Sequence, residues 1–354
     1  MTQEWFLPGS SVYGCLVPLD QAPRAALVRA RAAGRRAATL VCTEVDLVRA
    51  RRGAADFAVF HELVPPPTGG GHQFVRALVG ELERRGFAVE LNRISGGTPV
   101  CLFNSFNFDL RRLRRFARAG CRMVHRVDGP IGAYRGYDDG TDRRVAAINA
   151  ELAAATVLQS RYSLERHHEL GYELRDPIVI GNAPDPALFH PPSGEREPLD
   201  GRPLRLVATS WSDNRRKGFD ALEALDRTLD PERVELTFVG RSPVRFDRIR
   251  MLPPVPSTEL AELLRRHDAY LAASLDDPCS NALLEALACE LPAVYRRSGG
   301  HPELVGEAGV AFDEPEELPA AIECLAAGLE GYRAAIRVPA LADVADRYLE
   351  VLRA

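Results

Sequence analysis

The sequence lacks paired cysteines. Its seven cysteines are scattered singly over 354 residues, their number is odd, and no two of them are spaced as CxxC. This distribution argues against a disulfide framework and against a structural zinc site, and it fits a reducing compartment. We therefore expect neither disulfide bonds nor a structural zinc site.

A basic surplus and long apolar runs are also missing. The net charge is -4, whereas general nucleic-acid binders carry positive charge that neutralises phosphates, so we expect no nucleic-acid partner. No apolar run approaches the roughly 18 residues that span a bilayer, and the start MTQEWFLPGSSVYG lacks the pattern of a signal peptide. We expect a soluble, cytoplasmic protein.

The chain is long, and apolar segments alternate regularly with amphipathic ones along it. At 354 residues it exceeds the size at which one core usually stops growing, which favours two domains. Short runs rich in Val, Leu and Phe predict buried parallel strands, and amphipathic helical patterns separate them, so an α/β, doubly wound fold is expected. The predicted strands include residues 56–64, 121–128, 204–210, 234–240 and 269–274.

One stretch, FHPPSGEREPLDGRP at 189–203, is rich in Pro, Gly and charge and is the best linker candidate. We therefore predict a Rossmann-like domain in residues 1–192 and a second one in residues 201–330. A helical segment, 331–354, is predicted to pack back on the N-terminal domain. Residues 1–55 form an atypical, basic extension to which we assign no function.

Two carboxylates, Asp277 and Glu285, bracket the start of a predicted helix. Ser280 fits the N-cap of that helix. Parallel sheets bind ligands at the carboxyl ends of their strands, where helix N-termini attract anions, so a diphosphate fits this place and Glu285 could accept hydrogen bonds from a ribose. The alternative for Glu285 is a solvated helix residue, and spacing alone does not decide.

A basic run, Arg215, Arg216 and Lys217, follows the predicted strand at 204–210. In a doubly wound sheet this run faces the same crevice as Asp277 and would neutralise a diphosphate. Taken alone, such a run is more often a solvated surface.

Two glycine-rich stretches follow predicted strands. In PPPTGGGHQF (65–74), Gly70 and Gly71 would let a ligand approach the backbone closely, although the spacing is not GxGxxG. In SGGHPELVGEAG (298–309), Glu303 lies near the carboxyl end of a strand.

The run from Asp277 to Gly309 resembles the C-terminal signature of family 4 glycosyltransferases, the group 1 glycosyl transferases. That family has two glutamates eight residues apart, a helix of the LLEALACGLP type and then SGGxPELV, and SNALLEALACELP and SGGHPELV match it. VIGNAPDPALFHP (178–191) and Lys217 before Gly218 are similar to further family motifs. The resemblance covers roughly residues 56–330 and implies a GT-B fold, two Rossmann-like domains facing a central cleft.

The resemblance further implies a retaining, metal-independent glycosyltransferase (EC 2.4). It would move a sugar from a UDP- or GDP-sugar, its donor substrate, to an unidentified acceptor such as a glycan, a lipid-linked sugar or a small molecule, with no cofactor required. Glu285 takes the place of the ribose-binding glutamate. Asp277, one methylene shorter than the family's first glutamate, would contact the donor sugar and is a catalytic candidate. The remaining donor-binding residues implied are Gly70, Gly71, Arg215, Arg216, Lys217, Ser280, Asn281, Ala282 and Glu303.

The N-terminal domain of the family offers a histidine near the donor sugar, and MVHRVDGPIG presents His125 and Asp128 as catalytic candidates. We favour Asp128, because it lies closer to the Gly-Pro turn. The family's arginine before the lysine is Ser212 here, so Arg215 or Arg216 would supply the second charge. A non-catalytic protein that binds nucleotide sugars or a partner, and another GT-B enzyme such as an epimerase or a phosphorylase, are the alternatives.

Two further patterns are given simpler interpretations. His167 and His168 are adjacent on a predicted helix and point in different directions, so we expect surface residues and not a metal pair. The basic run LRRLRRFARAG at 110–120 predicts a solvated helix face with its leucines turned inward. Its alternative is peripheral contact with anionic lipid at the inner membrane face.

Overall fold

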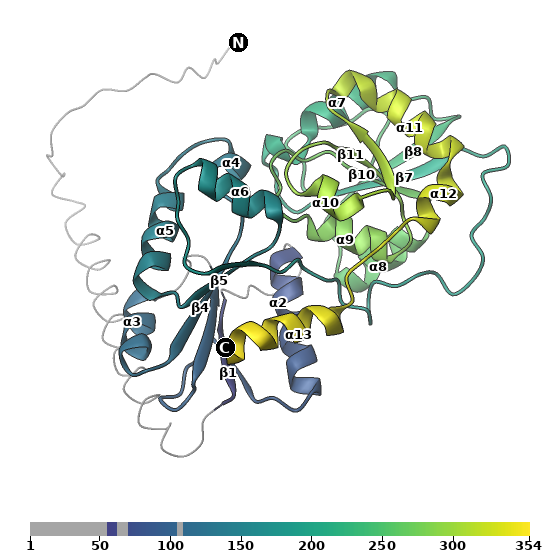
Figure 1. The fold of residues 1–354 in the computed structure, drawn as a ribbon. Coiled ribbons are helices and arrows are strands. Elements are labelled where there is room, and N and C mark those ends of the chain that lie inside the picture. The colour runs from purple at the N-terminus through teal and green to yellow at the C-terminus, as the bar shows by residue number, and fades with distance from the viewer. Residues whose placement is uncertain (1–54, 62–69, 105–108) are drawn as a thin grey trace, which may run out of the picture.

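The computed structural model describes residues 55–61, 70–104 and 109–354. Two sheets of six strands each, all parallel, organise these residues (Figure 1). The expected pair of doubly wound α/β domains is confirmed. The predicted extension, apart from Ala55, and the first part of the glycine-rich stretch, 65–69, lie outside the described residues.

The N-terminal sheet has the strand order β2-β1-β3-β4-β5-β6. The four inner strands of this sheet are buried on both faces, as parallel strands covered by helices must be, whereas the two edge strands are partly exposed. The strands are β1 (Phe57–Phe60), β2 (Val89–Leu91), β3 (Val100–Asn104), β4 (Arg122–Val127), β5 (Ala155–Leu158) and β6 (Pro177–Val179). The helices of this part are α2 (Gly70–Arg84), α3 (Leu110–Arg118), α4 (Ile131–Arg135), α5 (Thr141–Leu152) and α6 (Arg161–Glu169).

The C-terminal sheet has the strand order β12-β11-β10-β7-β8-β9, so the chain reverses direction across the sheet beside β7. Such a reversal leaves a crevice at the strand ends in which α/β proteins bind ligands. The strands are β7 (Leu204–Ser210), β8 (Val234–Gly240), β9 (Arg250–Leu252), β10 (Ala269–Ala272), β11 (Ala293–Arg296) and β12 (Gly309–Phe312). The helices are η2 (Arg215–Lys217), α7 (Phe219–Thr228), α8 (Ser257–Arg265), α9 (Asn281–Ala288), α10 (His301–Val305), η3 (Pro315–Glu317), α11 (Leu318–Ala327) and α12 (Leu329–Ala334).

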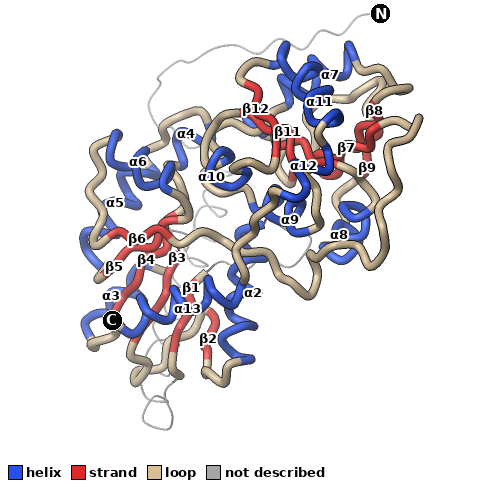
Figure 2. The backbone as a smooth tube through the Cα atoms, turned by 45° about the vertical axis from the view of Figure 1, so that its right-hand side comes forward, coloured by secondary structure: helices blue, strands red, loops and turns tan. Residues whose placement is uncertain are grey.

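Helices cover both faces of each sheet (Figure 2). In the C-terminal domain, α7 and α11 share one apolar core with the sheet, whereas α8, α9 and α10 share the other. In the N-terminal domain, α2 packs on one face, and α3 and α5 pack on the opposite one. Two separate cores per sheet are the arrangement that the alternation of segments predicts.

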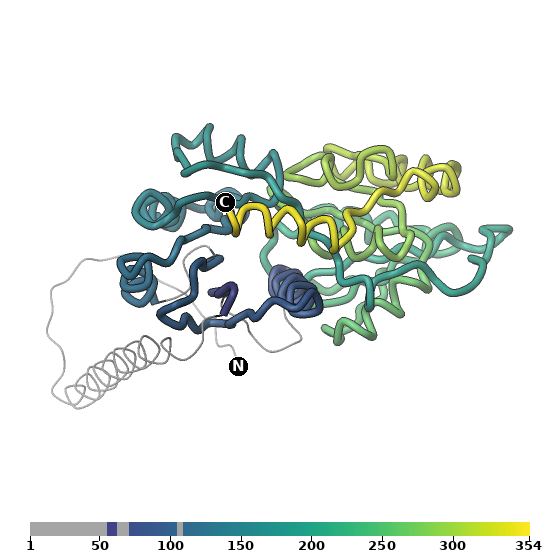
Figure 3. Tube along the Cα trace, turned by 60° about the horizontal axis from the view of Figure 1, so that its bottom comes forward, coloured from purple at the N-terminus to yellow at the C-terminus, as the bar shows by residue number. Residues whose placement is uncertain are grey.

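The last helix, α13 (Leu341–Arg353), lies on the N-terminal domain, where it runs beside the sheet in Figure 3. Leu341, Val344, Tyr348 and Leu352 are buried in the same core as α2 and the N-terminal strands. The end of the chain therefore ties the two domains together.

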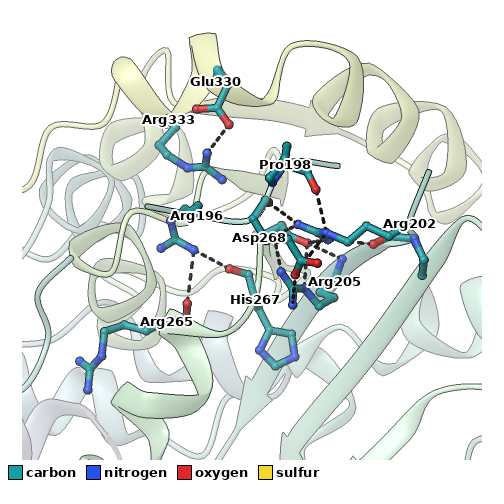
Figure 4. Close-up of polar contacts among 11 residues, drawn as sticks. Arg196, Pro198, Arg202, Arg205, Arg265, His267, Asp268, Glu330 and Arg333 are labelled. Carbon is teal, nitrogen blue, oxygen red and sulfur yellow. Dashed lines mark hydrogen bonds and ion pairs between the residues drawn. The ribbon is translucent and has the colours of Figure 1, made fainter. Parts of the chain in front are cut away.

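The predicted linker is anchored over its second half. Arg202 donates to both oxygens of Asp268, at 2.7 and 2.9 Å, and Arg205 pairs with the same buried carboxylate (Figure 4). Arg196 donates to the backbone carbonyl of His267 at 2.8 Å (Figure 4). These contacts attach residues 196–205 to the C-terminal domain.

Two of the simpler interpretations can be compared with the structure. On α3, Leu113 and Phe116 are buried, while Arg111, Arg115 and Arg118 are exposed, as the amphipathic pattern predicts. The expectation of a surface position is met by His168 but is wrong for His167, which is 2% exposed and whose Nδ1 lies 2.7 Å from the carbonyl oxygen of Ser163. Among the described helices, none is long and apolar enough to cross a membrane.

Candidate functional site

A cavity of about 410 Å³ lies between the two domains, at the carboxyl ends of both sheets. Its C-terminal wall is formed by the ends of β7 and β10, the loops that follow them and the first turn of α9. The N-terminal wall contributes His61, His72, Asn104, Asp128, Tyr134 and Gln159, and the C-terminal wall contributes Thr209, Trp211, Lys217, Asp277, Ser280, Asn281 and Ala282.

Lys217 reaches the cavity because the loop after β7 closes into the short helix η2. The side chain of Asn214 accepts from the backbone N–H of Arg216 and starts this helix. Gly218 ends it with φ 89°, and a Cβ there would lie 2.5 Å from the carbonyl carbon of Ala273. Only glycine lets the loop pack this closely against the end of β10.

Lys217 forms an ion pair with Asp277, whose Oδ2 lies 2.9 Å from Lys217 Nζ. The ammonium also lies 4.9 Å from the ring centre of Tyr134, which belongs to the other domain. Burial acts to lower the pKa of Lys217, but the Asp277 carboxylate outweighs it and the pKa lies above its usual value. Burial acts to raise the pKa of Asp277, but Lys217 and His301 hold the net pKa below normal. Both groups are therefore charged at neutral pH.

The segment after β10 is held by the glycines of the SGG sequence. The N–H of Gly300 donates to the carbonyl oxygen of Asp277 at 2.9 Å. Gly299 has φ 63°, and a Cβ there would clash with the same oxygen. These two glycines thus fix Asp277 and do not face the cavity themselves.

The first turn of α9 faces the cavity. Ser280 is the N-cap, and its hydroxyl accepts from the N–H of Leu283 at 3.4 Å, as the sequence predicts. Ser280, Asn281 and Ala282 all line the cavity beside Lys217. A cation and a helix N-terminus side by side suit a polyanionic ligand such as a diphosphate.

Glu285 lies one turn deeper and does not line the main cavity. Glu285 is 4% exposed, and it lines a small second cavity together with Gln73 of α2 and Asp185. Burial raises the pKa of Glu285 to about 8, so the carboxyl group is largely protonated at neutral pH.

Three other predicted donor-binding residues make contacts elsewhere. Arg215 pairs with Glu223 on the surface, and Arg216 pairs with Asp276. Glu303 accepts from the backbone N–H groups of Arg161 and Tyr162, at 2.9 and 2.7 Å, and so caps α6 from across the domain boundary. None of the three lines the cavity.

In the N-terminal wall, the two catalytic candidates are separated. Asp128 follows β4 and lines the cavity, with its side chain 40% exposed. His125 is fully buried, stacks on Phe103 with ring centres 4.3 Å apart and does not line the cavity. Since strand residues alternate in direction, His125 points into the domain core and not toward a ligand. At the first turn of α2, Gly71 lines the cavity and Gly70 is the first helical residue.

Sequence reasoning missed a histidine pair in this wall. His61 Nε2 lies 3.2 Å from His72 Nδ1, and both residues line the cavity. The pKa of His61 is lowered to about 4, mainly by burial and secondly by the positive charge of Arg126, so its imidazole is neutral. A signal was present, because His61 lies in the predicted strand 56–64 and His72 follows the glycines, but nothing in the sequence pairs them.

Within the described residues, no group of three or more His, Cys, Asp or Glu side chains could hold a metal ion. Lys217, next to the start of α9, supplies a positive charge to the cavity.

Residues 204–327 match the family model described as "Glycosyl transferases group 1". One subunit of human phosphatidylinositol N-acetylglucosaminyltransferase is 29% identical over 166 residues, which cover 43% of this chain and 32% of the relative. The chain therefore spans about a third of the length of the curated relatives it matches.

Solved structures match over most of the chain. Sucrose-phosphate synthase from Thermosynechococcus elongatus superposes with a TM-score of 0.62 at 16% identity, covering 84% of this chain and 94% of that one. HepE from Anabaena, in complex with UDP and glucose, gives a TM-score of 0.62 at 14% identity, covering 84% and 99%. The fold is therefore GT-B, as predicted, and the group 1 domain together with the curated relatives supports a glycosyltransferase of class EC 2.4.

Proposed function

We propose that this protein is a retaining glycosyltransferase of family 4 that moves a sugar from a nucleoside diphosphate sugar to a hydroxyl group of an acceptor. The observation that carries the proposal is the position of Lys217, which lies in the interdomain cavity beside the first turn of α9. The similar Anabaena structure contains UDP and glucose, which favours a UDP-sugar here, with a GDP-sugar as the alternative.

In this proposal the diphosphate lies against Lys217 and the backbone amides at the start of α9. Both would stabilise the negative charge that develops on the leaving phosphate oxygens. The first N–H groups of a helix have no partner within the helix, so they are available to a phosphate oxygen. The lysine and the helix together would do the work that a metal ion does in other sugar transferases.

Asp277 and Asp128 are proposed to contact the transferred sugar from opposite walls. Asp277 accepts from Lys217 in the present structure and would accept from a sugar hydroxyl once the lysine engages the diphosphate. Asp128 lies in the facing wall with an accessible carboxylate. Glu285 would bind the ribose only if α9 or α2 shifts, because it now lines the separate small cavity.

The transferred sugar and the location are further parts of the proposal. The human relative is named for N-acetylglucosaminyl transfer, which makes N-acetylglucosamine a first sugar to try. The exposed arginines of α3 support peripheral contact with anionic lipid at the inner face of a membrane by a cytoplasmic protein.

The proposal is tested with a panel of sugar nucleotides that includes UDP-sugars, GDP-sugars and ADP-sugars. For the full chain, we expect thermal stabilisation that rises with concentration for one base, and slow release of that nucleoside diphosphate. If none of the sugar nucleotides stabilises the protein or is consumed, the proposed function is wrong.

A further inference from the structure

One buried cation lies behind the cavity wall. Arg126 of β4 is 1% exposed and is the largest of the fully buried side chains. Its guanidinium donates to side-chain oxygens on four separate segments. These are Asn104 at the end of β3 (2.8 Å), Asp128 after β4 (3.1 Å), Asn182 after β6 (2.9 Å) and Tyr348 of α13 (3.2 Å).

A buried guanidinium must be paired, because removing its charge from water costs several kcal/mol. Its carboxylate partner is Asp128, whose Oδ1 faces Nη1 of Arg126. The ring of Phe74 adds a cation–π contact at 5.2 Å. Burial acts to lower the pKa of Arg126, but Tyr348 and Asp128 outweigh it, so the group is a permanent charge. Asp128 is thus held in a fixed direction at the cavity wall.

The same network crosses to the other domain through Asn182, which is fully buried. The Oδ1 of Asn182 accepts from Arg126, so its amide nitrogen faces the other way. That nitrogen donates to Gln159 at 2.8 Å and to Asn281, the first residue of α9, at 3.0 Å. Gln159 in turn donates to Asp128. The hydrogen bonds that link Asp128, Gln159 and Asn281 therefore depend on one orientation of the Asn182 side chain.

We propose that Arg126 is a positioning residue. It holds Asp128 in the cavity and, through Asn182, fixes the first turn of α9 on the opposite wall. Because Tyr348 belongs to α13, docking of the C-terminal helix is coupled to the same geometry. The assignment of a role in sugar transfer rests on the proposed function, but the coupling between the two walls does not.

The first experiment measures hydrogen–deuterium exchange at α9 in the full chain. Arg126→Lys keeps the charge but loses the planar guanidinium that reaches four partners. We expect the amides of residues 283–285, which are hydrogen-bonded at the start of α9, to exchange several-fold faster in this variant, although the substitution lies in the other domain. Arg122→Lys is the matched control, since Arg122 is on the same strand and donates to the carbonyl oxygen of Val351 in α13 without lining the cavity.

A second variant covers the case in which Arg126→Lys does not fold. Asn182→Asp keeps an acceptor for Arg126 but removes the amide donor to Gln159 and Asn281. It is expected to fold and to show the same faster exchange at the start of α9. Unchanged exchange in this variant, or equal exchange in Arg126→Lys and Arg122→Lys, would overturn the proposal.

The second experiment uses turnover of whichever sugar nucleotide the wild-type protein hydrolyses. A misplaced contact group costs up to about 100-fold in rate, so we expect kcat to fall about 10- to 100-fold in Arg126→Lys. KM for the donor is expected to rise as well, because the first turn of α9 is proposed to hold the diphosphate. A purely structural role would instead lower the amount of active enzyme and leave both constants unchanged. If the wild-type protein turns over no sugar nucleotide, the proposed function fails, and the exchange experiment still decides on the network.

Discussion

Lys217 and Asp277 are 60 residues apart in the chain, and their side chains form a 2.9 Å ion pair inside the interdomain cavity. The lysine comes from the loop after β7 and the aspartate from the loop after β10, two neighbouring parallel strands. The carboxyl ends of such strands share one edge of the sheet, which brings the two charges together. The pair keeps a cation charged in the cavity that, in our proposal, receives a diphosphate.

Replacing Lys217 by Gln is expected to weaken binding of the preferred nucleoside diphosphate about 10- to 100-fold, because a hydrogen bond to a charged group contributes roughly 1.5–3 kcal/mol. Isothermal titration calorimetry measures the change. The matched control is Arg215→Gln, since Arg215 belongs to the same short helix but pairs with Glu223 at the surface. Equal affinity in wild type and Lys217→Gln would remove the lysine from the donor site.

The raised pKa of Glu285 leads us to expect that the free energy of unfolding depends on pH. Its pKa is raised from 4.5 to about 8 in the folded protein, so between these values the folded state binds a proton that the unfolded state has released. The free energy of unfolding therefore loses a contribution of about 1.4 kcal/mol per pH unit as pH rises through this window, and levels off above it. Glu285→Gln removes this contribution.

The measurement is urea unfolding of wild type and Glu285→Gln at pH 5, 6, 7 and 8. Buried histidines such as His61 and His267 have lowered pKa values and give the opposite trend at acidic pH, but they are the same in both proteins. The difference between the two curves therefore isolates Glu285. We expect the variant to gain stability relative to wild type with each step in pH, and parallel curves would contradict a buried, protonated carboxyl group.

The anchored linker predicts a large effect of a small change. Asp268 is 3% exposed at its side chain and accepts from both Arg202 and Arg205. Asp268→Asn removes the charge that both cations face, and breaking a buried pair costs about 3–5 kcal/mol of unfolding free energy. Glu323→Gln is the control, because Glu323 pairs with Arg233 at an exposed position where such pairs contribute about 1 kcal/mol or less. Urea unfolding that shows equal losses would contradict the anchoring role.

Much of the fold could be predicted because buried parallel strands have a simple composition. The predicted strands at 204–210 and 234–240 have the observed limits. The predicted strand at 56–64 is too long, since β1 ends at Phe60. An apolar run shows that a segment is buried, whereas the end of a strand is set by its hydrogen-bonded neighbour, which the sequence of one segment does not contain.

The positions of some candidate site residues follow from local rules. A helix start after a strand places Ser280 and Asn281 at the cavity, and a basic loop after the adjacent strand places Lys217 there. The partners of Glu303 depend on how the two domains meet, and the partner of Arg216 depends on how the loops after β7 and β10 pack, and no local pattern encodes either. Neither the histidine pair nor the contacts of Arg126 could be read from the sequence, because they depend on how separate segments of the N-terminal domain and α13 pack together.

Neutralising Asp277 is expected to change the affinity for the nucleoside diphosphate in the direction opposite to that of neutralising Lys217. The carboxylate of Asp277 pairs with the Lys217 ammonium, which a diphosphate would also bind. The same carboxylate would repel the phosphates of a bound ligand. Asp277→Asn is therefore expected to raise the affinity for the nucleoside diphosphate alone, about 3- to 10-fold, because removing a like charge near a ligand is worth roughly 1 kcal/mol.

The sugar nucleotide should behave differently from the nucleoside diphosphate in the same variant. If Asp277 accepts hydrogen bonds from the transferred sugar, the preference of the protein for the sugar nucleotide over the nucleoside diphosphate shrinks in Asp277→Asn, and hydrolysis of the donor slows. Calorimetry with both ligands on both proteins measures the ratio directly. A fall in the affinity for the nucleoside diphosphate would show that Asp277 acts by holding Lys217 in place, and an unchanged ratio would show that it does not contact the sugar.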